Sequence, residues 1–202
     1  MKNQIASPAF KLKLAGIFAL AGLTPMLAQA HPGHGVANGF TAGFSHPLFG
    51  LDHIFAMVAV GLWAAQLGGR SRWAVPAAFV GLMAMGGALG MAGIHVPMVE
   101  AGILASVLVL GIVIAAAVRP PMFAGMALVG LFALFHGHAH GTEIPAAASG
   151  FTYALGFVLA TVALHACGVA LGVFTQKELS ARTLRYAGAA IALAGICLWS
   201  VK

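Results

Sequence analysis

The sequence has very few charged residues, and this scarcity excludes most soluble folds. Only 7% of its 202 residues are Asp, Glu, Lys or Arg, and 61% are apolar. A soluble globular domain typically has about 25% charged and about 45–50% apolar residues. Long stretches that are almost free of charge, separated by short polar loops, instead indicate an all-α membrane protein.

Cysteine is also scarce, and several catalytic motifs are missing. Cys167 and Cys197 lie inside apolar stretches, where we expect buried side chains rather than a disulfide or a Cys-rich metal site. The sequence contains no nucleotide-binding loop, no His-Glu-x-x-His zinc-protease motif and no Gly-x-Ser-x-Gly nucleophile elbow. We therefore predict neither an ATP-driven pump nor an enzyme.

The start of the chain has the features of a secretory signal. Lys2, Lys11 and Lys13 precede or open an apolar run over 14–23, and Ala28-Gln29-Ala30 has the small-x-small cleavage pattern. We predict a cleavable signal peptide over 1–30; the alternative is an uncleaved first helix. Without those three lysines the chain keeps seven basic and four acidic residues and no basic patch with interleaved aromatics. Nucleic acid is therefore not an expected partner.

Six later stretches are apolar enough and close enough to the required length, about 20 residues, to cross a bilayer as helices. They are 49–68, 74–94, 97–118, 121–137, 150–174 and 184–201. We therefore predict that residues 31–202 form one domain, a bundle of six transmembrane helices.

The basic residues predict the orientation of this bundle. Those of the mature chain lie after the first, third and fifth spans, except for Lys202: Arg70, Arg72, Arg119, Lys177, Arg182 and Arg185. Short cytoplasmic loops are enriched in Lys and Arg. Together with the cleaved signal, this predicts periplasmic N- and C-termini in a bacterial inner membrane.

With this orientation, eight of the nine histidines and three of the four carboxylates lie at or near the periplasmic face. They include two clusters: His46, Asp52 and His53, then His136, His138, His140 and Glu143. Charged groups at bilayer depth are costly and usually functional. Imidazole with carboxylate suits nickel, zinc, copper or iron, and the imidazoles must be neutral to bind.

The second cluster has two interpretations. If it is helical, His136 and His140 lie one turn apart, Glu143 follows at the next i+3 position, and His138 faces elsewhere. If it is extended, all three histidines share a side. In the first cluster, Pro47 and Gly50 indicate an irregular entry into the first span. His46 and His53 are seven residues, or two helical turns, apart and could share a face even with an imperfect entry.

Other polar residues leave alternatives open. Asp52 could ligate a metal, orient an imidazole, or complement a helix N-terminus. Glu100 could add a ligand from the third span or cap that helix. His165, inside the fifth span, could lie on an inward pathway or hydrogen-bond a neighbouring helix. His31 and His34 could collect metal or belong to a solvated tail.

Two segments resemble the paired motifs of the HupE/UreJ family. One is His46-Pro47…Gly50…Asp52-His53…Ala56-Met57…Gly61…Trp63, and the other is the run over 135–143. The resemblance implies a bacterial nickel permease linked to hydrogenase or urease maturation, with cobalt as an alternative ion. It implies that the two clusters form the metal motifs and that the metal is transported rather than held as a prosthetic group.

Two other functions remain open, a metal-binding accessory protein and an intramembrane metalloenzyme. The expected partners are a divalent metal ion and the lipid bilayer, and a homo-oligomer is compatible with the sequence.

Overall fold

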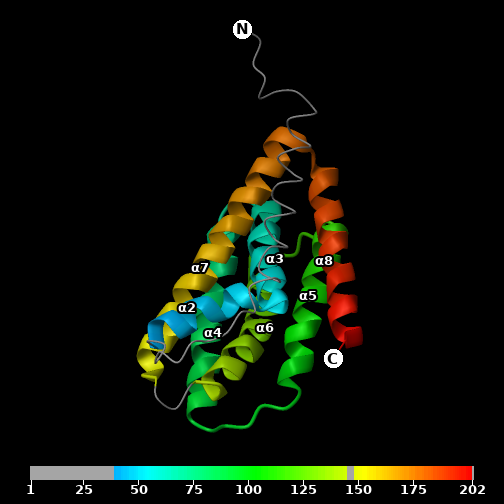
Figure 1. The fold of residues 1–202 in the computed structure, drawn as a ribbon. Coiled ribbons are helices and arrows are strands. Elements are labelled where there is room, and N and C mark those ends of the chain that lie inside the picture. The colour runs from blue at the N-terminus through cyan, green and yellow to red at the C-terminus, as the bar shows by residue number, and fades with distance from the viewer. Residues whose placement is uncertain (1–38, 145–147, 202) are drawn as a thin grey trace. The chain divides into compact units, whose positions relative to one another are not determined.

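The computed structural model describes residues 39–144 and 148–201, and the secondary structure of this part is helical (Figure 1). The helices are α2 (Gly39–Phe49), α3 (Leu51–Leu67), α4 (Ser71–Met91), α5 (Val99–Ala115), α6 (Met122–Thr142), α7 (Gly150–Phe174) and α8 (Ala181–Val201). A π-helical turn, η3 (Thr175–Leu179), joins α7 to α8. The predicted signal peptide over 1–30, His31, His34 and Lys202 lie outside the described residues.

Helices α3 to α8 occupy the six predicted stretches. By length and composition, α4, α6, α7 together with η3, and α8 each qualify as a membrane span. Helices α2 and α3 qualify jointly as one more span, bent by 79° at the break between them. Helix α5 is apolar but has only 17 residues. The described part of the chain therefore has four or five candidate spans, and a sixth crossing through α5 stays a prediction.

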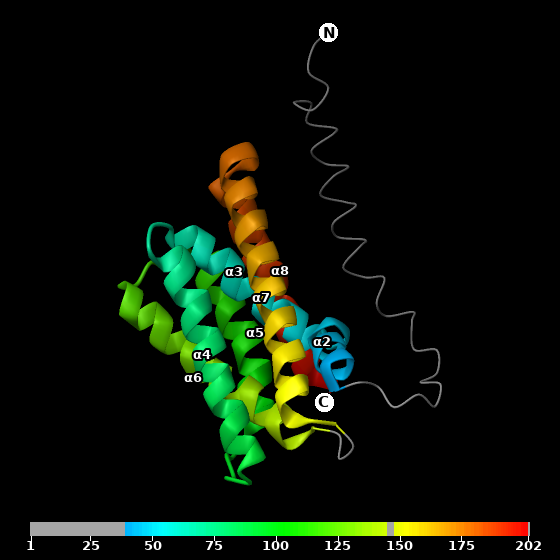
Figure 2. The same ribbon diagram turned by 90° about the vertical axis from the view of Figure 1, so that its left-hand side faces the viewer.

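Helix α2 was not predicted as a separate element. The chain is helical on both sides of Gly50, which itself is extended with φ −87° and ψ 114°. Pro47 lies inside α2 and supplies no backbone N–H to that helix. The expected irregular entry is thus a sharp break between two helices. Helix α2 packs mainly against α7 (Figure 2), and this tertiary contact supports a short helix that its own sequence would not stabilise.

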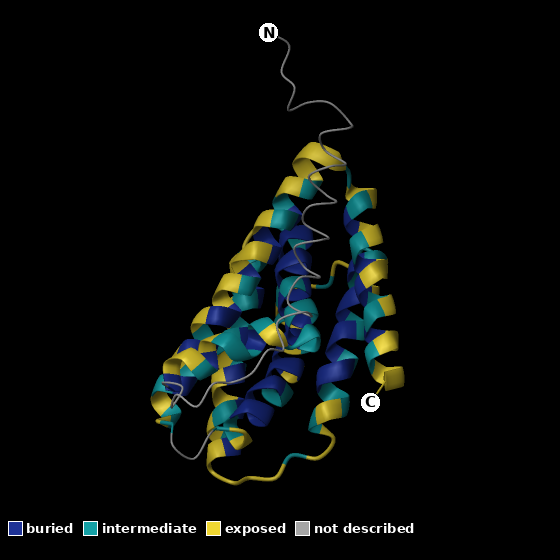
Figure 3. Cartoon of the chain, in the orientation of Figure 1, coloured by how far each residue is buried: buried dark blue, intermediate teal, exposed yellow. Residues whose placement is uncertain are grey.

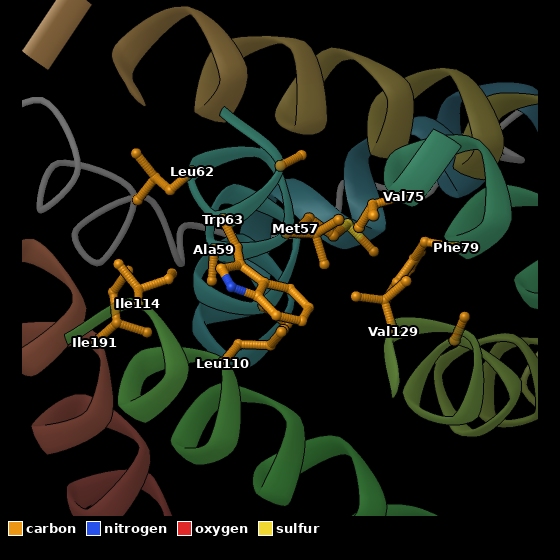
Figure 4. Close-up of a cluster of buried hydrophobic side chains, with 14 of the residues drawn as sticks. Met57, Ala59, Leu62, Trp63, Val75, Phe79, Leu110, Ile114, Val129 and Ile191 are labelled. Carbon is orange, nitrogen blue, oxygen red and sulfur yellow. The ribbon is translucent and has the colours of Figure 1, made fainter. Parts of the chain in front are cut away.

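Helix α3 is the centre of the bundle and contacts α2, α4, α5, α7 and α8. Eleven of its 17 residues are buried, and buried residues elsewhere lie on the inward faces of the other helices (Figure 3). Met57 and Trp63 are fully buried there, beside Phe79 of α4 and Leu110 of α5 (Figure 4). The polar edge of Trp63 donates to the Val118 carbonyl at 3.1 Å, so its burial leaves no unpaired donor.

Helices α4 and α6 lie close enough for their backbones to touch. A Cβ atom placed on Gly137 would clash with the Met83 carbonyl oxygen and lie 2.8 Å from the Gly87 nitrogen. Only glycine permits this approach at position 137. The close contact holds the histidine-rich end of α6 against α4.

The ends of three helices meet at one end of the bundle. Gln66 donates to the Ile114 carbonyl at 3.1 Å, Gln176 donates to the Ala65 carbonyl at 3.1 Å, and Arg185 donates to the Ala115 carbonyl at 2.7 Å. These bonds bring together the ends of α3, α5 and α7 and the start of α8. The connections predicted to face the cytoplasm leave from this end.

The two cysteines do not lie where they were expected. Cys167 of α7 and Cys197 of α8 are both exposed, so the expectation of buried side chains was wrong. They share the outer surface with large apolar residues such as Leu193, Ile196 and Trp199. In a membrane bundle the outer face is apolar as well as the core, so hydropathy does not separate buried from lipid-facing residues.

Candidate metal centre

Three imidazoles from three different helices converge at one point. His46 of α2, His53 of α3 and His140 of α6 each offer a ring nitrogen, and these nitrogens all lie within 4.8 Å of one another. The ring centroid of His140 lies 4.4 Å from that of His46 and 4.6 Å from that of His53. Within the described ranges, this is the one group of at least three potential ligands that meets this spacing.

The Asp52 carboxylate orients His53. Its Oδ1 lies 2.6 Å from His53 Nδ1 and also accepts from the His53 backbone N–H at 2.9 Å. An ionised carboxylate only accepts, so Nδ1 carries the proton and Nε2 keeps its lone pair. This is the carboxylate–histidine arrangement that raises the basicity of metal ligands. Of the three roles considered for Asp52, the geometry favours orienting the imidazole.

Gly50 makes this arrangement possible. A Cβ atom at position 50 would lie 2.8 Å from His53 Nδ1 and 2.9 Å from Asp52 Oδ1. The break between α2 and α3 therefore does two things: it turns the chain, and it leaves room for the Asp52–His53 pair. It also explains why His46 and His53 approach although they lie on different helices, rather than on one helical face.

The second cluster is helical, which decides between its two interpretations. Helix α6 continues through Thr142, so His136 and His140 lie on the same side of it and Glu143 follows directly after its end. Glu143 Oε2 lies 3.7 Å from His140 Nδ1, within ion-pair range but too far for a hydrogen bond. A small rotation of the half-exposed Glu143 side chain would bring its carboxylate to the imidazole or to a bound ion.

A hollow of about 280 Å³ opens at the three imidazoles. Its lining includes three of the four carboxylates in the whole sequence, Asp52, Glu100 and Glu143. Glu100 comes from the first turn of α5, so a fourth helix contributes to the hollow. His95, in the loop before α5, is exposed and is not among the lining residues.

Helix ends of both kinds meet at this hollow. His46 lies in the last turn of α2 and His140 in the last turn of α6. The carbonyl groups at a helix C-terminus carry a partial negative charge that attracts cations. The starts of α3 and α5 lie at the same hollow and carry the opposite partial charge, so the three carboxylates are what favour a positive ion at the imidazoles.

His136 lies behind the hollow rather than in its wall. It is fully buried, and its ring meets that of His53 edge-on with 5.0 Å between centroids. Ser106 donates its hydroxyl proton to the Ile103 carbonyl at 2.6 Å, so its oxygen accepts from His136 Nε2–H at 3.0 Å. The lone pair of His136 is then on Nδ1, which is buried without a partner. Such an unsatisfied group typically costs about 1–3 kcal/mol.

His138 is turned away from the other histidines of its segment. Its Nε2–H donates to the Ile94 carbonyl at 2.7 Å, which ties the end of α6 to the loop after α4. It does not line the hollow. The prediction that His138 faces elsewhere in a helical segment is confirmed, and its position lends no support to the prediction that it binds metal.

Two neighbours of the histidines escaped the sequence analysis. The Phe157 ring of α7 packs at a tilt against that of His140, with 4.2 Å between centroids, and lies edge-on to His46 and His53. No local pattern marks it among the apolar residues of α7. Ser106 had a weak signal, because it is the sole hydroxyl residue in the apolar helix α5.

The imidazoles fit a divalent ion after a small adjustment. His53 Nε2 and His140 Nε2 lie 2.5 Å apart, which suits a proton shared between them. Two nitrogens that bind one ion at about 2.0–2.1 Å with a right angle between the bonds lie about 2.9 Å apart. These two rings therefore need to separate by a few tenths of an ångström, and any ligand pair near the 4.8 Å limit must close to about 4.2 Å or less. Three imidazoles with carboxylates form a donor set for nickel, cobalt or zinc.

Comparisons with known proteins identify the family of the chain. No solved structure matches the chain. Protein HupE of Rhizobium leguminosarum bv. viciae is 48% identical over 175 residues, which cover 86% of this chain and 91% of that protein. The model of the HupE / UreJ protein family matches residues 18–198. The chain therefore belongs to the HupE/UreJ family.

Proposed function

We propose that the protein carries divalent nickel, or cobalt, across the bacterial inner membrane from the periplasm to the cytoplasm. The observation that supports this most strongly is the composition of one hollow. Three imidazole nitrogens from three helices lie within 4.8 Å of one another, and three of the chain's four carboxylates line the same hollow. Such a concentration of ligands and negative charge in a chain with 7% charged residues favours a cation as substrate.

The hollow and the basic connections support the proposed orientation. The connections with Arg70, Arg119 and Lys177 follow the ends of α3, α5 and α7, which hydrogen bonds bring together. The hollow lies at the start of α3 and of α5 and at the end of α6, that is, at the opposite ends of these helices. If the basic end faces the cytoplasm, the hollow faces the periplasm. This proposal includes cleavage after residue 30 and six crossings by residues 31–202.

Capture would proceed in two stages. The carboxylates of Glu100 and Glu143, both exposed, attract the hydrated ion to the hollow. The ion then exchanges water for the nitrogens of His46, His53 and His140, while Asp52 holds the His53 ring in its binding tautomer. The delivered ion would serve the maturation of a hydrogenase or a urease, in line with the family resemblance.

Uptake of radioactive nickel by the purified protein in liposomes tests this function. Ions bound outside are removed with EDTA, which does not cross the bilayer, so the remaining counts report accumulation. We expect accumulation with the unaltered protein and with His138→Gln, and none with His53→Ala. Binding without accumulation in the unaltered protein would reject the permease and favour a metal-binding accessory protein.

A further inference from the structure

Two adjoining hollows form a furrow on the outer surface between α4 and α7. Helix α4 packs mainly on α6, and α7 packs mainly on α3 and α2, so the sides that α4 and α7 turn toward each other are only partly covered. One hollow, of about 510 Å³, lies at the end of the bundle that bears the basic connections. The other, of about 390 Å³, lies deeper. Trp73, Ala166 and Val169 line both hollows, so the furrow is continuous.

The furrow is positively charged at one end. Arg72, in the first turn of α4, and Lys177, in η3, both line the first hollow. They come from its two walls and are the charged residues among those that line it. Glu178, which follows Lys177 in the sequence, is not among the residues that line this hollow. The mouth of the furrow is therefore suited to an anion.

The deeper part of the furrow is apolar and ends at His165. Nδ1 of His165 lies 2.9 Å from the Met57 carbonyl oxygen, and because a carbonyl only accepts, this nitrogen donates. The bond ties α7 to α3, and 3% of the His165 surface is exposed. The other residues that line this hollow are apolar or aromatic. Such a lining favours hydrocarbon and disfavours an ion, which would lose its hydration without gaining polar partners.

The furrow has the length of one leaflet of a bilayer. Trp73 and Phe174 line its charged end and are 69% and 43% exposed, and aromatic rings, those of Trp and Tyr above all, are enriched at the membrane–water interface. From Phe174 to Val162 the furrow follows α7 for 12 residues, which is about 18 Å of helix. The hydrocarbon of one leaflet is about 15 Å thick, half of a core of about 30 Å. An acyl chain can therefore lie along the furrow while its headgroup stays at the charged end.

The guanidinium group of Arg72 has a donor to offer. Its Nε–H is buried and has no hydrogen-bond partner among the described residues. An unsatisfied buried donor is costly, and more so on a charged group. A rotation of the side chain toward the hollow would present Nε–H and a second N–H to two oxygens of one phosphate, which is the paired geometry that Arg favours. Lys177 adds a positive charge from the other wall.

We propose that the furrow binds an anionic phospholipid, with its phosphate between Arg72 and Lys177 and an acyl chain between α4 and α7. Basic pockets between membrane helices are suited to anionic headgroups in this way. A zwitterionic phospholipid meets the same apolar walls but brings no net charge to the two cations, so it binds more weakly. The site requires neither metal nor transport; only its assignment to the cytoplasmic leaflet rests on the orientation given with the proposed function.

Native mass spectrometry of the detergent-purified protein counts bound lipids and tests the charged end. We expect phosphatidylglycerol to bind severalfold more tightly than phosphatidylethanolamine with the same acyl chains. Arg72→Gln/Lys177→Gln should lower the affinity for phosphatidylglycerol by about tenfold or more, because each basic residue near an anionic lipid contributes severalfold. The control Arg119→Gln/Arg182→Gln removes two exposed cations elsewhere and should keep the affinity within about twofold. Equal affinity for the two lipids, or equal losses in the two double variants, would overturn the proposal.

A second pair of variants tests the apolar part of the furrow. Ala166 is exposed and lines both hollows, so Ala166→Phe would fill the furrow where they join. Ala163→Phe places the same ring at an exposed position of α7 that lines neither hollow. We expect Ala166→Phe alone to lower the affinity for phosphatidylglycerol by about tenfold, with equal unfolding temperatures for the two variants. Unchanged affinity in Ala166→Phe would overturn the proposal. Because these measurements involve no nickel, a failure of the permease proposal would leave their outcome unaffected.

Discussion

The hollow at the start of α3 and the interior around Phe79 both contain histidines, but their surroundings differ. In the hollow, His46, His53 and His140 are accompanied by three carboxylates. In the interior, His136 and His165 meet a hydroxyl, a backbone carbonyl and a phenyl ring. The first environment favours a doubly charged ion, whereas the second accommodates neutral imidazoles. The histidines of the hollow are therefore the candidates for binding the ion, and those of the interior bond to neighbouring helices.

The largest effect should come from His53→Ala. This variant removes one of the three nitrogens and the group that Asp52 orients. Changes in the second shell of a metal site typically cost about 10–100-fold in affinity, so loss of a direct ligand should cost about 100-fold or more. Nickel titration of the detergent-purified protein measures this. A similar loss in His138→Gln, whose side chain bonds to Ile94 outside the hollow, would remove the distinction between the two histidines.

Asp52→Asn should have the next largest effect. The amide keeps the shape of the carboxylate but removes its charge and weakens the hold on His53 Nδ1. We expect affinity for nickel to fall by about 10–100-fold, with a folded protein. Titration with nickel, together with thermal unfolding as a check of the fold, measures this. Unchanged affinity would mean that Asp52 serves the N-terminus of α3 rather than the metal.

Gly137→Ala tests whether packing in the interior controls the geometry of the hollow. The added methyl group would clash with Met83 and push α6 away from α4, which displaces His136 and His140. Overpacking of this kind typically costs about 1–3 kcal/mol of stability. We expect a lower unfolding temperature and a weaker nickel affinity. Gly81→Ala is the matched control, because a Cβ atom on that glycine of α4 meets nothing within 4 Å. Equal behaviour of the two variants would rule out this coupling.

The smallest effect should come from Glu100→Gln. Glu100 is exposed at the rim and lines the hollow, so we assign it to the attraction of the hydrated ion. We expect slower uptake by a few-fold at low ionic strength and a smaller difference at high ionic strength, where salt screens exposed charges. Uptake rates measured at two salt concentrations test this. A salt-independent loss as large as that of His53→Ala would make Glu100 a direct ligand instead.

The sequence predicted the helices well because long apolar runs and basic connections are local signals. It also singled out two clusters of histidine and carboxylate, and the hollow contains members of each. It missed α2, whose stability comes from packing on α7, and it allowed a helical face to join His46 and His53 where the structure has a break at Gly50. Contacts such as Phe157 on His140 are tertiary and leave no mark on a local pattern.

Whether a side chain is buried was harder to predict than which helix carries it. The two cysteines were expected inside and lie outside, because apolar side chains face both the core and the lipid. His140 lines the hollow and His138 does not, because α6 continues as a helix to Thr142. The glycines around these histidines are compatible with a helix or an extended segment, so the sequence did not decide between them. The hydrogen bond of His165 to the Met57 carbonyl of α3, one of its two expected alternatives, is likewise a property of the folded chain.

X-ray absorption at the nickel edge is the most direct test of the central claim, that the ion binds through His46, His53 and His140. For the nickel-loaded protein we predict outer-shell scattering from three imidazoles, with oxygen in the remaining positions and no sulfur. In His140→Ala the imidazole contribution should fall from three rings to two. A spectrum without imidazole scattering, or one that His140→Ala leaves unchanged, would contradict the account.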